Sequence, residues 1–171
     1  MNNTLYILCG LPYAGKTTLR NELAKRFGFS SVSIDEIMDR RGMWSLGHPT
    51  QKDWNTAYSE GYKQLKGLLG KGKTVILDLG NLKFKERETA RQIAKSLGVE
   101  SKLIFVNTPQ DEILRRGLEN AKTKERGHVP EKFLGKGLKM FEQPTPEENP
   151  ILYNSEVNLE DWIRENINGS D

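Results

Sequence analysis

A loop between two glycines, in the segment ILCGLPYAGKTTL at residues 7–19, constrains the fold of this chain more than any other feature. Gly10, four residues, Gly15, Lys16 and Thr17 fit the phosphate-binding pattern G-x-x-x-x-G-K-[ST] at every fixed position. A short apolar run typical of a buried strand precedes the loop, and apolar residues at helical spacing follow it until the next glycine. The loop is therefore predicted to join a strand to a helix N-terminus.

Glycines let such a loop wrap closely, so that its N–H groups and the positive end of the helix face phosphate oxygens. We therefore expect the phosphate loop, residues 10–18, to bind the cofactor ATP through Gly10, Leu11, Pro12, Tyr13, Ala14, Gly15, Lys16, Thr17 and Thr18. Lys16 is the candidate for reaching the β- and γ-phosphates, and the Thr17 hydroxyl is a candidate ligand of Mg²⁺. The alternative is an ordinary strand-to-helix turn, which the flanking pattern disfavours.

Length and composition are those of one globular domain over residues 1–171. The net formal charge of +3 is small beside 26 basic and 23 acidic side chains, and by itself gives no argument for a nucleic-acid or membrane partner. Cys9 is the only cysteine and is expected to be buried rather than nucleophilic, which fits a reducing, cytoplasmic location. No apolar stretch approaches the roughly 20 residues that span a bilayer, so no membrane partner is expected.

Apolar runs and helical periodicities alternate along the chain and predict an α/β fold. Strands are expected at residues 5–9, in FSSVSIDEI ending at Asp35, in TVILDLGN ending at Asp78, in KLIFVNTP and in PILYN. This alternation indicates a five-stranded parallel sheet with helices on both faces and ligands at the carboxyl ends of the strands. The phosphate loop, Asp35 and Asp78 all fall at such ends.

The two aspartates have different candidate roles. Asp35 is suited to accepting a proton from an acceptor hydroxyl, or to orienting it, although it could equally cap the helix that begins EIM. Asp78 follows four apolar residues, the form of a Walker B aspartate that holds Mg²⁺ directly or through water. The alternative for Asp78 is a turn residue at a strand end.

A polar, basic stretch at about residues 115–129, RRGLENAKTKERGH, follows a predicted helix. We interpret it as a helical lid whose arginines, led by Arg116 and Arg126, close over ATP and stabilise transition-state charge. The alternative is a solvated charged face.

The acceptor-binding region is expected at about residues 36–66. Arg40 and Arg41 are weak candidates for anchoring a phosphate of the acceptor. A capped helix with aromatic residues at helical spacing, Trp54 and Tyr58 among them, occupies the second half of this region. The aromatic stripe is assigned to the core rather than to base stacking.

The chain resembles the small P-loop kinases related to polynucleotide kinase, through GLPYAGKTT, SIDEI, VILDLGN with Arg87 following, and the arginine-bearing stretch after NTP. HVPEKFLGKGLKMFEQPTPEE is also similar to the corresponding stretch of the seryl-tRNA kinases, and the zeta-toxin-like P-loop kinases belong to the same group. The resemblance implies a P-loop NTPase fold, Asp35 as general base, and Arg116 and Arg126 as lid arginines that contact the donor phosphates. In the lid of these kinases two arginines are usually four residues apart, and Asn120 stands in place of the second one. Arg87 is a further weak candidate for contacting the substrate.

These features predict an ATP- and Mg²⁺-dependent kinase that transfers the γ-phosphoryl group to a hydroxyl, with a polynucleotide 5′-hydroxyl as the leading acceptor. The alternatives are a kinase of a small molecule or of a tRNA-linked amino acid, and a nucleotide-binding ATPase module that transfers nothing. The expected partner is thus a hydroxyl-bearing substrate, with nucleic acid as the leading case. No oligomeric state follows from the sequence.

Overall fold

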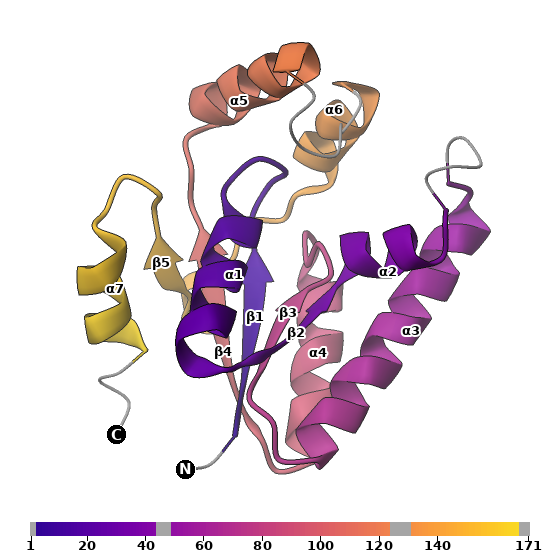
Figure 1. Ribbon diagram of the computed structural model, residues 1–171, viewed down its shortest axis with the longest axis vertical. Helices are drawn as coiled ribbons and strands as arrows, with labels where there is room; N and C mark the ends of the chain where they lie inside the picture. The colour runs from indigo at the N-terminus through magenta and orange to yellow at the C-terminus, as the bar shows by residue number, and fades with distance from the viewer. Residues whose placement is uncertain (1–2, 44–48, 124–130, 168–171) are drawn as a thin grey trace.

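The computed structural model describes residues 3–43, 49–123 and 131–167 (Figure 1). Its strands are β1 (Thr4–Cys9), β2 (Ser30–Ser33), β3 (Val75–Asp78), β4 (Glu100–Val106) and β5 (Ile151–Tyr153). Its helices are α1 (Lys16–Phe27), α2 (Ile34–Arg40), α3 (Gln51–Gly70), α4 (Phe84–Ser96), α5 (Gln110–Thr123), α6 (Glu131–Met140) and α7 (Leu159–Asn166), with a short 3-10 helix, η1 (Pro146–Glu148), before β5.

The described strands form one sheet in the order β2-β3-β1-β4-β5, and every neighbouring pair is parallel. The predicted α/β fold with a five-stranded parallel sheet is therefore confirmed. From β1 the chain passes first toward β2 at one edge and later toward β4 and β5 at the other, so the loop after β1 lies at the topological switch point. Ligands of doubly wound sheets bind at this place.

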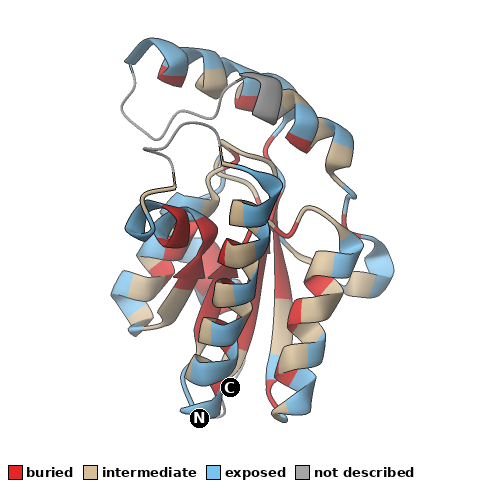
Figure 2. Cartoon of the chain, turned by 90° about the vertical axis from the view of Figure 1, so that its right-hand side faces the viewer, coloured by how far each residue is buried: buried red, intermediate tan, exposed pale blue. Residues whose placement is uncertain are grey.

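Alternating side chains of β1 enter two separate cores, one on each face of the sheet. Leu5 and Ile7 pack among buried residues of α2, α3 and α4, whereas Tyr6 and Leu8 pack among those of α1 and α7. The buried residues gather along the strands between the helical layers, as Figure 2 shows. Because both faces of the sheet are covered, its polar groups are accessible chiefly at the ends of the strands.

Local signals account for several helix ends. Thr50 and Asp53 form the predicted capping box at the start of α3, and Gly28 ends α1 in the left-handed conformation. Asn158 accepts hydrogen bonds from two backbone N–H groups and begins α7, also as predicted. These ends depend on neighbours within a few residues, which is why the sequence pattern identifies them.

The predicted second strand was too long. β2 ends at Ser33, whose side chain accepts a hydrogen bond from Glu36 N, and α2 begins at Ile34. Ser33 is thus the N-cap of α2, so the capping alternative for Asp35 is wrong. Ile37 and Met38 are buried on the inner side of this helix.

Helices α5 and α6 lie beyond the carboxyl ends of the strands, next to the loop that follows β1 (Figure 1). The first part of the predicted lid is helical, because α5 continues to Thr123. The helical spacing of Ile113, Leu114 and Leu118 predicts that all three face inward. Ile113 is buried, but the prediction is wrong for Leu114 and Leu118, which are 39% and 65% exposed. Among residues 3–43, 49–123 and 131–167, no helix has the length and apolarity needed to cross a membrane.

Candidate functional site at the phosphate loop

The phosphate loop has the backbone conformation that its glycines allow. Gly10 and Gly15 have φ angles of +154° and +107°, which side-chain-bearing residues rarely adopt. A Cβ atom on Gly10 would lie 2.8 Å from the carbonyl oxygen of Val106, so β4 approaches the loop too closely for any other residue. Thr108 Oγ1 donates a hydrogen bond of 2.7 Å to Ala14 O and fixes the loop from the same side.

Lys16 begins α1, and its side chain folds back over the loop. The Nζ atom donates hydrogen bonds to Gly10 O at 2.8 Å and to Leu11 O at 2.9 Å. Thr17 and Thr18 follow in the first turn and are exposed, and this turn contains no acidic residue. A helix N-terminus without a carboxylate of its own, beside an ammonium group, is suited to binding an anion.

Asp78 lies close enough to Asp35 for its charge to act on the Asp35 carboxyl group. Asp35 is exposed on α2, but neighbouring protein atoms desolvate its carboxyl group and raise its pKa above the ordinary value. The nearby Asp78 carboxylate raises this pKa further, and Lys16 lowers it. The two carboxyl groups and the loop lysine therefore converge at the carboxyl ends of β1, β2 and β3, although they are far apart in the sequence. Arg20, an α1 residue not singled out in the sequence, forms an ion pair with Glu36 at 2.7 Å.

The donor set at this point fits Mg²⁺. Asp78 ends β3 with a side chain only 8% exposed, and the nearest cationic atom, Arg20 Nη1, lies 3.9 Å from its Oδ2. The carboxylates of Asp35 and Asp78, with the Thr17 hydroxyl in the first turn of α1, are hard oxygen ligands of the kind that Mg²⁺ prefers. Thr17 and Asp78 are thus the residues that could hold the metal.

Helix α5 contacts the phosphate loop through Arg116. Its Nη1 donates to Tyr13 O at 3.2 Å, and its Nη2 donates to Ser155 Oγ at 2.9 Å. Asn120, one turn further on, donates from Nδ2 to the Tyr13 hydroxyl at 3.5 Å. The predicted lid arginine Arg116 therefore lies at the loop, while Arg126 lies outside the described residues.

Arg87 is not available to a substrate. The residue is fully buried, and its Nε and Nη2 donate to the two carboxylate oxygens of Glu148 at 2.8 and 2.7 Å. Its Nη1 donates to the backbone oxygens of Asn81, Leu82 and Glu142. We correct the expectation that Arg87 contacts the acceptor, because its guanidinium instead joins β3, α4 and the segment after α6.

Arg40 and Arg41 lie at the end of α2 and on the surface. Both are held by Glu60 of α3, from Arg40 Nη2 at 2.8 Å and from Arg41 Nε at 2.5 Å. Asp35 lies at the opposite end of the same short helix. The two arginines therefore do not touch the groups around Asp35.

Two site residues were not predicted from the sequence. The Tyr58 hydroxyl lies 3.5 Å from the position of a Cβ atom on Gly80, just beyond β3, and Asp35 is among the charges that act on it. The helical spacing of Tyr58 with other aromatic residues predicted only a core position, and the Tyr58 ring does pack, partly buried, against the core. Asn81 has a φ of +51° and donates from Nδ2 to Leu8 O at 2.8 Å, which ties the end of β1 to the turn after β3. No local pattern distinguishes this asparagine.

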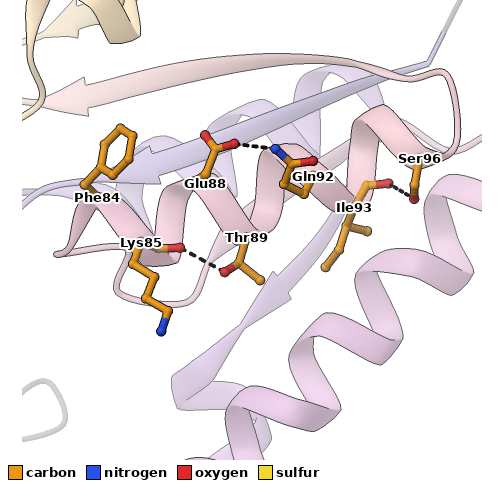
Figure 3. A pocket seen from close by; sticks show the side chains of 7 residues that line it. All are labelled: Phe84, Lys85, Glu88, Thr89, Gln92, Ile93 and Ser96. Carbon is orange, nitrogen blue, oxygen red and sulfur yellow. Dashed lines mark hydrogen bonds between the residues drawn. The ribbon is translucent and has the colours of Figure 1, made fainter.

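A hollow of about 500 Å³ lies along the exposed side of α4, away from these groups (Figure 3). It is lined by Phe84, Lys85, Glu88, Thr89, Gln92, Ile93 and Ser96. Its polar side chains bond within the helix, as Gln92 does to Glu88. Because no polar groups converge on its interior, this hollow lacks the character of a binding site.

Solved structures with the same arrangement have been compared with this chain. A gluconokinase from Sinorhizobium meliloti 1021 is 18% identical with a TM-score of 0.69, and the match covers 98% of this chain and 91% of that one. The Mycobacterium tuberculosis APS kinase CysC in complex with AMPPNP and APS is 16% identical with a TM-score of 0.70, covering 98% and 96%. Kti12 from Chaetomium thermophilum in complex with ADP-AlF3 is 19% identical with a TM-score of 0.70, covering 94% of each chain. At these identities the likeness is one of fold.

The sheet order and the phosphate loop at its switch point define a P-loop NTPase fold of the type found in these structures. A model of the AAA domain family matches residues 5–144, and the chain belongs to this family. No curated protein matches the sequence.

Proposed function

We propose that this protein is an ATP- and Mg²⁺-dependent kinase that transfers the γ-phosphoryl group of ATP to a hydroxyl, with a polynucleotide 5′-hydroxyl as the leading acceptor. The observation that carries the proposal is the convergence of Asp35, Asp78 and Lys16 at the strand ends beside the phosphate loop. A nucleotide-binding module needs the loop and the lysine, but it has no use for a second, partly desolvated carboxylate. The nucleotide complexes of the APS kinase and of Kti12 support ATP as the donor.

The reaction follows from these groups. The loop N–H groups and Lys16 hold the β- and γ-phosphates, and the acceptor oxygen bonds to the γ-phosphorus as the bond from phosphorus to the β–γ bridging oxygen breaks. Asp35 takes the proton of the acceptor hydroxyl, and ADP leaves with the bridging oxygen. Thr17 and Asp78 would hold Mg²⁺, which when bound would supply positive charge at the phosphate oxygens. Arg116, already at the loop, contributes positive charge from α5.

The first experiment measures transfer of label from γ-labelled ATP with Mg²⁺ to a panel of acceptors. The panel holds 5′-hydroxyl RNA and DNA, aminoacylated tRNA, gluconate and APS, because the neighbours of this fold include small-molecule kinases. We expect label on the oligonucleotides. ATP hydrolysis without a labelled acceptor would contradict the kinase and favour an ATPase module.

Replacing Lys16 with Ala removes the ammonium group at the loop. We expect transfer to fall by at least about 10²-fold, the scale for losing one charge-stabilising donor. The circular dichroism spectrum is expected to stay unchanged, because the Nζ atom bonds only to loop carbonyls. A fully active variant with an intact spectrum would contradict the assignment of the phosphate loop.

Tyr58 is the second acceptor-side group that we propose. Among the described residues its hydroxyl has no hydrogen-bond partner, and burial, followed by the charges of Glu86, Tyr62 and Asp35, raises its pKa, so the hydroxyl stays protonated and able to donate. Replacing Tyr58 with Phe should raise the acceptor KM about 5- to 10-fold, the equivalent of one hydrogen bond, with little change in the KM for ATP.

Tyr62 provides the matched control for this prediction. It lies one turn further along α3, and burial raises its pKa to about 12, with Glu86 rather than Asp35 as its charged neighbour. Replacing Tyr62 with Phe removes the same atom away from Asp35 and should leave both KM values unchanged. Equal effects of the two substitutions would mean that the hydroxyls act through packing of α3 and not on the acceptor.

A further inference from the structure

A second hollow, of about 850 Å³, lies along the exposed side of α3 at Arg41, which follows α2. Figure 1 shows that α2 and α3 lie next to each other. We call it the α3 hollow, and it is lined by Arg41, Lys52, Asn55, Thr56, Ser59, Glu60, Lys63 and Gln64. Every one of these side chains is charged or able to form hydrogen bonds, and none is apolar. Its volume lies in the range of about 300–1,000 Å³ that is usual for ligand clefts.

Glu60 organises the basic edge of the α3 hollow. Its carboxylate accepts hydrogen bonds from Arg41, Arg40 and Gln64, and the bonds from the two arginines lower its pKa. The arginine side chains nevertheless stay exposed, Arg40 by 58% and Arg41 by 42%. Because each guanidinium has five N–H groups and gives one to Glu60, each exposed arginine has N–H groups left to donate to a ligand.

The α3 hollow and the adjoining Arg40 are locally basic. With Arg40 the α3 hollow has four basic side chains against the single acid Glu60, a surplus of three. The whole chain has a net formal charge of +3, so the basic and acidic side chains elsewhere balance. A local surplus of this kind attracts a polyanion even though the total charge of the protein is small.

The α3 hollow lies at a defined distance from the proposed reaction centre. Asp35 is in the first turn of α2, and Arg41 directly follows its last residue. A helix rises 1.5 Å per residue, so about 9 Å of helix axis separate the two. Stacked nucleotides advance about 3.4 Å each, so this distance corresponds to about three nucleotides of a single strand.

We propose that the α3 hollow binds the phosphodiester backbone of a single-stranded polynucleotide. The direction of the bound strand follows from the proposed function, on which this inference rests. The 5′-hydroxyl would lie at Asp35, and the phosphates of the next nucleotides would lie at the α3 hollow. Contacts to phosphate and sugar come mainly from Arg, Lys, Ser, Thr, Asn and Gln, which are the residue types that line it together with Glu60. A peptide-binding surface would need buried apolar or aromatic anchors, and the lining has none.

The test measures binding without ATP, by fluorescence anisotropy of 3′-labelled, 5′-hydroxyl RNA and DNA 12-mers over a range of salt concentrations. The double variant Lys52→Ala with Lys63→Ala removes two charges from the α3 hollow. The control, Lys66→Ala with Lys71→Ala, removes the same charge from exposed positions on the same helix and at its end, outside the hollow. RNA and DNA are separate arms because the backbone chemistry is common to both.

For the first double variant we expect affinity to fall about 10-fold and the slope of log K against log salt to decrease by about 1 to 1.5. The control is expected to bind like the unchanged protein. Equal weakening in both variants, or no weakening in either, would overturn the proposal. So would displacement of the oligonucleotide by polyglutamate as readily as by unlabelled RNA or DNA, because an acidic peptide would then be the better match.

The transfer assay separates this proposal from the proposed function. Binding that depends on Lys52 and Lys63, without label on the 5′ end, would support the α3 hollow and contradict a polynucleotide kinase. If the 5′ end is labelled, and kcat/KM for the oligonucleotide is the same in the hollow variant as in the control variant, the result would support the kinase and contradict binding at the α3 hollow. The two proposals can thus fail independently.

Discussion

Replacing Asp35 with Asn should lower kcat by about 10²- to 10⁴-fold, the span for loss of a group that accepts a proton in the transition state. The substitution keeps the size of the side chain, and Ser33 rather than Asp35 caps α2, so the helix should persist. ATP affinity is expected to change little, because the phosphate loop and Lys16 are unaltered. Single-turnover transfer and equilibrium binding of a nucleotide analogue measure the two effects separately.

The matched control for this variant is Asp39→Asn. Asp39 lies one turn further along α2, is exposed, and also raises the pKa of Asp35 by its charge. Removing it should change kcat by no more than about threefold, as for other exposed charges. If Asp35→Asn and Asp39→Asn lower kcat equally, the total negative charge of α2 would account for the loss of activity. Asp35 would then not be the general base.

The pH dependence gives an independent check on the same group. Because the ionised form of Asp35 accepts the proton and its pKa is raised, the acid limb of kcat/KM should have its midpoint above the ordinary value of about 3.9. NMR titration of the Asp35 carboxyl group without nucleotide should show the pKa falling in Asp78→Asn and rising in Lys16→Ala. These two shifts follow from the signs of the neighbouring charges. Unchanged values in both variants would show that the three groups are not coupled.

Glu148→Gln should be the most destabilising single substitution among those considered, by about 3 to 5 kcal/mol, because it leaves the buried Arg87 without a counter-charge. The Glu148 side chain is 3% exposed and also accepts a hydrogen bond from Arg91 at 2.6 Å. Chemical denaturation measures the free energy of unfolding, and the thermal midpoint should fall on the order of 10 °C. Glu147→Gln, at the exposed neighbouring position, changes the same charge and should leave the midpoint nearly unchanged.

The same carboxylate makes stability depend on pH. Burial alone would raise the pKa of Glu148, but hydrogen bonds from Arg87 and Arg91 outweigh it and lower the pKa to about 2. A folded-state pKa below the ordinary value stabilises the protein above about pH 5, and the contribution of about 3 kcal/mol is lost as the pH falls toward 2. In Glu148→Gln this part of the acid destabilisation should be missing. A variant with the same acid dependence as the unchanged protein would contradict the assignment.

Local patterns identified much of the fold and the donor side of the site. The phosphate loop depends on glycines at fixed spacing, and the capping box of α3 depends on Thr50 and Asp53 three residues apart. Such features follow from conformational preferences of neighbouring residues, so one sequence is enough to predict them. The apolar run that ends at Asp78 identified β3 for the same reason.

The errors arose where distant parts of the chain meet. Leu114 and Leu118 have helical spacing, yet they are exposed, because α5 lies beyond the strand ends and packs through Ile113. Arg87 was a weak candidate for contacting the substrate, but Glu148, far along the chain, makes its burial possible. An arginine pattern in the sequence gives no information on whether a counter-charge will arrive from elsewhere.

The sequence by itself determined the α/β class, the phosphate loop and the two strand-end aspartates, since each is encoded within a few neighbouring residues. Only tertiary packing brings Asp35 and Asp78 into one electrostatic environment and places the Tyr58 hydroxyl next to Gly80, just beyond β3. It also brings basic residues at the end of α2 and on α3 to one hollow. Strand order and helix packing bring these groups together across long stretches of chain. Distances between such groups depend on the whole packed sheet, so no local pattern contains them.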